Sequence, residues 1–139
     1  MDRPVVGTSV IIIKDGKVLL GKRKKKIGYD QYQFCGGKID MFEDLEDGAA
    51  REAKEETNLD VKNVKFITAT NDVYKEYNKH YITLFFVADY AGGELKNMEP
   101  DKADDWDWYD WDNLPEPLFL PIKNLLKQGF NPFEINENK

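Results

Sequence analysis

Cysteine, histidine and long apolar runs are scarce in this sequence. Its 139 residues include one cysteine, Cys35, and one histidine, His80, so it can form no internal disulfide and has no Cys/His zinc motif. Unbroken apolar runs such as Val10 to Ile13 are far shorter than the roughly 20 residues that cross a bilayer. The first residues also lack the apolar core of a signal peptide. We therefore expect a cytoplasmic protein with no membrane partner.

Basic residues are in the minority. The 20 Lys and Arg residues against 26 Asp and Glu give a net charge of −6. This balance argues against a nucleic-acid polymer as partner, because phosphate backbones bind to basic surfaces. With 41% hydrophobic residues, the chain has the length and apolar content of one compact domain. We expect residues 1–139 to form a single domain, of which 131–139 are a loose C-terminal tail.

Apolar and β-branched stretches predict strands on both sides of an acidic segment. A β-hairpin is expected around Asp15-Gly16, which suits a type I′ turn. Pro121 predicts the first turn of a final helix that ends at Gly129. The segment Asn71–Lys79 either extends the strand before it or forms a turn. The expected strands are Val5–Ile13, Val18–Leu20, Tyr32–Phe34, Val61–Thr70, Tyr81–Ala88 and Trp106–Tyr109.

Negative charge is concentrated in one short segment. From Glu43 to Glu56 there are seven acids against two bases. The segment predicts a helix from Asp44 to Thr57, with Asp44 as its N-cap and Asn58 in a left-handed cap conformation. A glycine inside a helix costs about 1 kcal/mol relative to alanine, so we expect a packing reason for Gly48.

Three carboxylates share one face of this helix. Glu52, Glu55 and Glu56 follow at i, i+3 and i+4, so they repel one another unless a cation lies between them. A hard divalent cation would use their oxygens as ligands, although most charged runs are simply solvated helix faces. The opposite side carries small residues that suit close packing on a sheet, namely Ala50, Ala53 and Thr57.

The residues around these carboxylates resemble the Nudix box. Gly37, five residues, Glu43, seven residues and then the stretch from Arg51 to Leu59 match its pattern of glycine, glutamate and Arg-Glu-aliphatic-x-Glu-Glu-x-Gly-aliphatic. Two positions differ, because Ala53 is smaller than the usual aliphatic residue and Asn58 replaces the final glycine. The sequence is identified as a member of the Nudix hydrolase family, most similar to its MutT-like nucleoside triphosphate pyrophosphatases.

This resemblance implies an α/β fold, the Nudix α/β/α sandwich with a central mixed β-sheet. It implies that Glu52, Glu55 and Glu56 hold Mg²⁺, with Mn²⁺ as a substitute, and that the Gly36 carbonyl is a further ligand. Glu99 is our first choice for an acid from outside the box, and Asp101 the second. Arg51, with Glu43, would orient the helix. The base that accepts the proton of the attacking water is expected to be Glu52, with Glu55 and Glu56 as alternatives.

A nucleobase needs an apolar slot with a few polar groups. Our candidates for this slot are Gln33, Phe34, Thr83, Phe119 and Leu120, although ordinary core packing explains the apolar ones equally well. Arg23 and Lys38 are candidates to meet the phosphates, with a solvated basic loop as the alternative. For His80 we expect a hydrogen-bonded strand residue.

Three hypotheses follow for the activity. The first is a pyrophosphohydrolase that cleaves a nucleoside triphosphate, including modified or deoxy forms, to the monophosphate and pyrophosphate. The second is a pyrophosphatase of a nucleoside diphosphate linked to another group, such as ADP-ribose or a sugar nucleotide. The third is a non-catalytic nucleotide-binding module, which the intact glutamate set disfavours. The resemblance favours the first and suggests a homodimer.

Overall fold

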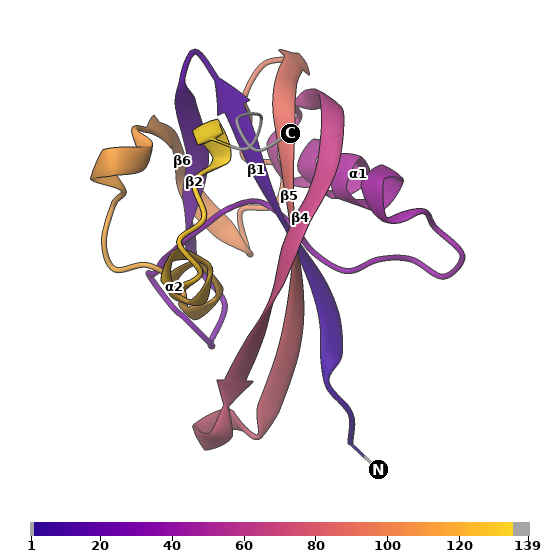
Figure 1. The fold of residues 1–139 in the computed structure, drawn as a ribbon, viewed down its shortest axis with the longest axis vertical. Coiled ribbons are helices and arrows are strands. Elements are labelled where there is room, and N and C mark those ends of the chain that lie inside the picture. Colours follow the sequence, from indigo (N-terminus) through magenta and orange to yellow (C-terminus); the bar gives the residue numbers. More distant parts are fainter. Residues whose placement is uncertain (1, 135–139) are drawn as a thin grey trace.

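The computed structural model describes residues 2–134 and is built around one mixed β-sheet (Figure 1). Its strands are β1 (Val5–Lys14), β2 (Lys17–Arg23), β3 (Tyr32–Gln33), β4 (Asp60–Tyr74), β5 (Lys79–Gly92) and β6 (Ala103–Tyr109). Its α-helices are α1 (Leu45–Thr57) and α2 (Leu120–Lys127). Three short 3-10 turns complete the described chain, at Lys75–Tyr77, Trp111–Asn113 and Pro132–Glu134.

The strand order is β3-β2-β1-β5-β4, and β6 pairs with β2. Strands β1 and β5 run parallel, from Val5 opposite Tyr81 to Ile13 opposite Asp89. The other named strand pairs are antiparallel. The sheet is therefore mixed, as the resemblance implied.

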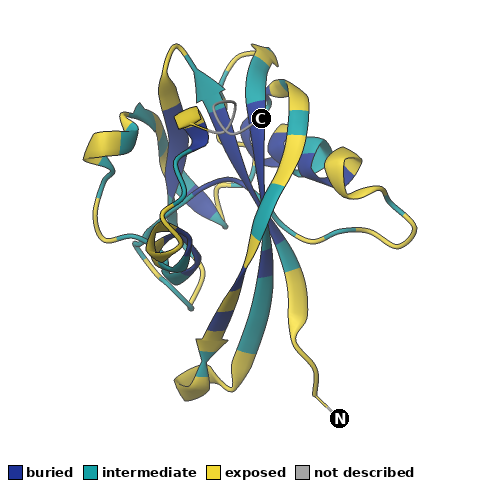
Figure 2. Ribbon diagram, viewed as in Figure 1, coloured by how far each residue is buried: buried dark blue, intermediate teal, exposed yellow. Residues whose placement is uncertain are grey.

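Side-chain alternation along the central strands divides the core into two layers. Because successive residues of a strand face opposite sides, Val10 and Ile12 pack with Ala49 and Ala53 of α1, whereas Ile11 packs with residues of α2. Figure 1 shows the two helices on opposite faces of the sheet, and Figure 2 shows the buried residues gathered where helices and strands meet. This arrangement confirms the predicted α/β/α sandwich.

The predicted strands are present, and all except β3 are longer than expected. The β1–β2 hairpin turns at Asp15 and Gly16, both of which have positive φ. Strand β4 continues to Tyr74, so the first part of the open segment Asn71–Lys79 extends the strand, and a turn that includes the 3-10 helix Lys75–Tyr77 leads into β5. Strand β3 is shorter than expected, because Phe34 turns into the core and Cys35 makes an isolated bridge to Val10.

Helix α1 has the expected ends, with Asp44 at the N-cap and Asn58 in the left-handed conformation at the C-cap. The Asp44 side chain makes no capping hydrogen bond. Gly48 has the expected packing reason, since a Cβ there would lie 2.6 Å from Ile39 Cδ1 and 2.9 Å from Glu43 Oε1. Ala53 and Thr57 are fully buried as expected, but the expectation for Ala50 was wrong, because Ala50 is only partly buried and Ala49 is fully buried in its place.

Side-chain amides fix α2 to strand β4. Asn124 Nδ2 donates to the carbonyl of Asn71 at 3.3 Å, and Gln128 Nε2 donates to that of Ala69 at 3.0 Å. Strand β4 lies at the edge of the sheet, where unpaired carbonyls could bind another chain. Here these carbonyls accept hydrogen bonds from within the molecule. These bonds hold the middle and the end of α2 against the sheet.

Two further expectations concern the membrane and the chain end. Within residues 2–134, no helix is long and apolar enough to cross a membrane. Of the segment expected to be a loose tail, Pro132 is buried and belongs to a 3-10 turn, while residues 135–139 lie outside the described part of the chain.

Candidate active site

The loop between β3 and α1 that contains Gly36 and Gly37, here called the glycine loop, is fixed against strand β1. The backbone N–H groups of Val10 and Thr8 donate to the carbonyls of Cys35 and Gly37, each at 2.7 Å. Between them, the Gly36 N–H donates to Glu56 Oε1 at 2.7 Å. In extended backbone, carbonyls alternate in direction, so the Gly36 carbonyl faces away from β1, on the side of Glu56. This orientation suits its expected use as an oxygen ligand.

Neither glycine of this loop leaves room for a side chain. A Cβ at Gly36 would lie 2.0 Å from the Thr8 carbonyl oxygen, in the backbone of β1. A Cβ at Gly37 would lie 2.1 Å from Glu52 Oε2. The paired glycines therefore let α1 bring its carboxylates directly against the loop.

The three carboxylates of α1 differ sharply in exposure. Glu56 is 4% exposed, the Glu52 side chain is 13% exposed and that of Glu55 is 47% exposed. Burial, with repulsion from Glu99 and Glu52, raises the pKa of Glu56 to about 7 despite its bond from Gly36. Burial is also the main cause that raises the pKa of Glu52. The helix pattern suggested that the three carboxylates share one open face. In the structure their exposure instead increases from the buried Glu56 to the solvent-exposed Glu55.

Arg51 joins four groups on the solvent side of the site. Its guanidinium donates to Glu43 Oε2 at 2.8 Å, to Glu52 Oε1 at 2.9 Å, to Glu55 Oε2 at 2.8 Å and to the Lys38 carbonyl at 2.9 Å. Its hydrogen bonds lower the pKa of Glu43. Arg51 thereby ties the loop before α1 to the helix, which is the orienting arrangement that the resemblance implied.

The loop before β6 brings a further acid to the same place. Met98 N–H donates to the Glu56 carbonyl at 3.1 Å, and Glu99 pairs with Lys102 at 3.0 Å. The negative charge of Glu99 raises the pKa of both Glu52 and Glu56, so Glu99 is close enough to repel both carboxylates. Asp101, the second choice, is exposed.

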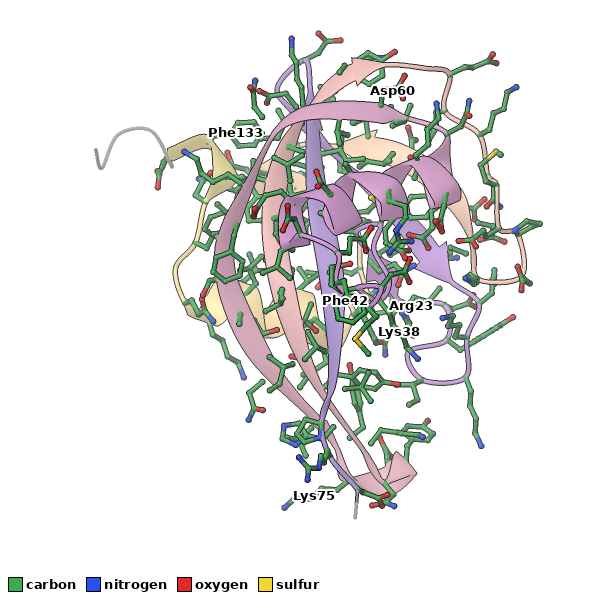
Figure 3. The ribbon with its side chains drawn as sticks, turned by 90° about the vertical axis from the view of Figure 1, so that its right-hand side faces the viewer. Arg23, Lys38, Phe42, Asp60, Lys75 and Phe133 are labelled. Atoms are coloured by element: carbon green, nitrogen blue, oxygen red, sulfur yellow. The ribbon has the colours of Figure 1, made fainter. Side chains whose placement is uncertain are left out.

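A cavity of about 590 Å³ opens beside Glu52 and Glu56. Six of the seven expected substrate residues line it, namely Arg23, Gln33, Phe34, Lys38, Thr83 and Phe119. Arg23 and Lys38 are seen below α1 in Figure 3. Leu120 differs from the expectation: it lines a neighbouring hollow of about 550 Å³, because the first turn of α2 rotates it away from the main cavity.

Two of these expected residues are already engaged within the protein. The Thr83 hydroxyl donates to the buried Asp72 at 2.6 Å, so it serves the sheet as well as the cavity wall. Phe34 is 3% exposed and packs against Phe85 and Trp111. The core-packing alternative thus describes part of the role of Phe34.

Three side chains form a stack along the cavity wall. The Arg23 guanidinium carbon lies 3.8 Å from the centre of the Phe119 ring, and Phe119 stacks on Tyr74 with ring centres 6.1 Å apart. Burial lowers the pKa of Arg23. The Tyr74 hydroxyl is buried and finds no hydrogen-bond partner among residues 2–134. A ligand in the cavity could supply that partner.

Several residues of this cavity were not among the candidates that the sequence suggested. Lys25, Lys26 and Lys102 add positive charge, and Tyr74 and Tyr81 add aromatic surface. Burial, followed by repulsion from Arg23 and Lys102, lowers the pKa of Lys25. The basic run in the sequence signalled the first two, but nothing in it distinguished Lys102 or the tyrosines from ordinary surface and strand residues.

The carboxylate end of the cavity fits a hard divalent cation. Among residues 2–134, no group of three or more Asp, Glu, His or Cys side chains is already arranged as metal ligands. However, Glu56 is buried and Glu52 is largely covered, and both carboxyl groups have raised pKa values. A cation would relieve both their burial and their repulsion.

The fold and the site together define a class of protein: a small α/β/α protein in which a helix that carries three glutamates lies beside a cavity lined by cationic side chains. Residues 3–128 match the family model described as "NUDIX domain". The "ADP-ribose pyrophosphatase" of Methanocaldococcus jannaschii is 34% identical over 116 residues, which cover 84% of this chain and 68% of that protein. The "NAD-capped RNA hydrolase NudC" of Edwardsiella ictaluri is 34% identical over 120 residues. That match covers 85% of this chain and only 44% of the NudC protein.

Among solved structures, the MutT NUDIX hydrolase from Burkholderia pseudomallei is similar, with a TM-score of 0.84 and 27% identity. The match covers 93% of this chain and all of that one. The chain therefore belongs to the Nudix family, as the box predicted, and it is a Nudix hydrolase that acts on phosphoanhydride bonds.

Proposed function

We propose that this chain is a divalent-metal-dependent pyrophosphatase of a nucleoside diphosphate linked to another group, with ADP-ribose as the leading substrate. The observation that carries the proposal is the cavity, in which five cationic side chains (Arg23, Lys25, Lys26, Lys38 and Lys102) face two glutamates. A diphosphate with a divalent cation complements this charge pattern. The identity to a protein named ADP-ribose pyrophosphatase, over 84% of the chain, supports this substrate over a triphosphate.

Each part of the cavity has a role in this proposal. Glu52, Glu55, Glu56, the Gly36 carbonyl and Glu99 supply oxygens for Mg²⁺, or Mn²⁺ in its place. When bound, the metal lowers the pKa of a water molecule and neutralises charge on the phosphoryl oxygens. Glu52 accepts the proton of the attacking water as the new O–P bond forms and the bridging O–P bond breaks. Arg51 acts as a positioning residue, since its bonds go to Glu43, Glu52 and Glu55.

The remaining walls hold the two organic groups. Phe119, Tyr74 and Tyr81 offer aromatic surface to a nucleobase, and the side-chain amide of Gln33 reads a polar edge. Arg23 and Lys38 contact the phosphates. We place the whole activity in one domain of residues 1–139, in the cytoplasm and without a nucleic-acid or membrane partner. A homodimer remains part of the proposal.

The test is a hydrolysis screen of the purified chain with Mg²⁺, and separately with EDTA. The panel contains ADP-ribose, sugar nucleotides, NADH, and normal and oxidised nucleoside triphosphates. We expect metal-dependent conversion of ADP-ribose to AMP and ribose 5-phosphate, with kcat/KM at least tenfold above that for any triphosphate. A profile confined to triphosphates would overturn the proposal.

The second candidate is the triphosphate pyrophosphohydrolase that sequence analysis placed first. The specific observation in its favour is the match to a MutT NUDIX hydrolase structure at 27% identity over 93% of the chain. It predicts pyrophosphate and a nucleoside monophosphate as products. The same screen separates the two candidates by product analysis.

A further inference from the structure

The cation-lined cavity contains one lysine that stands apart from the others. Lys102 Nζ lies 3.0 Å from Glu99 Oε2, and the side chain is 41% exposed. It lines the same cavity as Glu52 and Glu56, and the charges of both raise its pKa after the leading effect of its bond to Glu99. Lys102 therefore balances part of the carboxylate charge in the protein without metal.

The backbone of Lys102 is anchored while its side chain is not. Its N–H donates to the Glu99 carbonyl and its carbonyl accepts from the Lys24 N–H, both at 2.9 Å. Met98 fixes the same loop to the end of α1 through the Glu56 carbonyl. A change of side-chain rotamer would thus move the ammonium group within the cavity and leave the loop in place.

Arg51 is held by more bonds than Lys102. Its guanidinium is bonded to three glutamates and a backbone carbonyl, so leaving this place would break several charge-assisted bonds at once. Among residues 2–134, Lys102 has a single ion pair, at a partly exposed site, and such pairs add little to stability. A divalent cation that takes Glu99 therefore breaks one pair at Lys102, whereas displacing Arg51 altogether would break several bonds.

We propose that Lys102 is a displaceable counter-ion: a divalent cation takes Glu99 from it, and the freed ammonium group then binds the substrate diphosphate. This inference rests on the proposed function. Arg23, Lys25 and Lys38 line the same cavity, so the released lysine joins a set of cationic side chains that suits an anionic ligand. A compact ammonium on a flexible stem suits a phosphate oxygen.

The proposal predicts opposite changes in two affinities for Lys102→Met, measured by calorimetry on the full chain. The Kd for Mg²⁺ alone falls two- to fivefold, because the competitor for Glu99 is gone. The Kd for inorganic pyrophosphate in saturating Mg²⁺ rises about tenfold, because one phosphate partner is lost. A merely structural role would weaken both. Mg²⁺ affinity that is unchanged or weaker overturns the proposal, as does unchanged pyrophosphate affinity.

Three comparisons sharpen this experiment. Lys102→Arg keeps the charge and should bind Mg²⁺ within about twofold of the parent chain. Lys96→Met is the matched control, since Lys96 is an exposed lysine of the same loop, and it should change neither affinity. In a Glu99→Gln background, Lys102→Met should no longer tighten Mg²⁺ binding; a gain that persists would show that Glu99 is not the contested ligand.

Neither binding measurement depends on which nucleotide is hydrolysed. Failure of the proposed function would be seen in the substrate screen, as a preference for triphosphates or a lack of turnover. Failure of the lysine proposal would be seen in the two affinities, whatever the screen reports.

Discussion

The Arg23 guanidinium lies against the Phe119 ring, 3.8 Å from its centre, and so joins a residue of strand β2 to the residue that precedes helix α2. Arg23 also donates to the Ile27 carbonyl and to Gln33. The stack therefore fixes a phosphate-binding candidate and a nucleobase-binding candidate in one unit.

Phe119→Ala is expected to raise KM for the preferred nucleotide about tenfold while kcat falls less than threefold. The reason is that the substitution removes ring contact with the ligand and frees Arg23, but leaves the carboxylates untouched. Steady-state kinetics would check this result. Phe133→Ala is the control, because Phe133 is 41% exposed and lies in the last 3-10 turn. An unchanged KM would remove Phe119 from the substrate site.

Glu56→Gln and Glu55→Gln are each expected to reduce Mg²⁺-dependent turnover by two or more orders of magnitude. Each removes the charge of a proposed metal ligand while keeping the side-chain shape, and the amide oxygen introduced by Glu56→Gln can still accept the Gly36 hydrogen bond. Circular dichroism should confirm an intact fold, and Glu46→Gln, on the exposed first turn of α1, should retain activity. Near-normal turnover in both variants would refute the metal assignment.

The raised pKa of Glu56 predicts a pH-dependent stability in the metal-free protein. The folded protein holds this proton up to a pKa of about 7, whereas the ordinary value is 4.5, so the folded state binds more protons between these values. The free energy of unfolding should therefore fall as pH rises from about 4.5 to about 7. The contribution is on the order of 3 kcal/mol.

Urea titrations in EDTA across this pH window would measure the effect. Glu56→Gln should remove most of the fall, because its side chain does not titrate. Adding Mg²⁺ at pH 8 should stabilise the parent chain more than the variant. The same slope in both proteins would mean that another group is responsible.

Substitutions of the two loop glycines should cause different defects, one in turnover and the other in stability. Gly37→Ala places a Cβ against the Glu52 carboxylate, a side chain that can move, so turnover should fall at least tenfold with little loss of stability. Gly36→Ala places a Cβ against the β1 backbone at Thr8, which cannot move cheaply, so the free energy of unfolding should fall by a few kcal/mol. Activity assays and urea titrations on both variants would distinguish these outcomes; equal stability losses would contradict the assignment.

The regular elements could be predicted because local signals agreed with the final packing. Asp15-Gly16 fixed the first hairpin, and the left-handed Asn58 ended α1 where its sequence position suggested. The box spacing also led directly to the family. Side-chain hydrogen bonding confirmed the prediction for His80, which contacts Asn71 on the neighbouring strand.

The unequal environments within the site could not be predicted in the same way. Helical spacing puts Glu52, Glu55 and Glu56 on one arc, but the glycine loop covers one side of that arc and solvent the other. Likewise, the position of Lys102 depends on a loop that pairs with the end of α1 mainly through backbone atoms, at Thr57 and Glu56. Such contacts join segments distant in sequence and carry no residue-type signal.

The burial of Cys35 gives the protein an internal reporter. Its thiol is fully buried, with a pKa raised well above the usual range, and its carbonyl is bonded to β1. Since this is the only sulfhydryl of the chain, an alkylating reagent can react only after the glycine loop has separated from the sheet. The rate of modification would therefore time the opening of the loop that supports the metal site, in the native protein and without an engineered label.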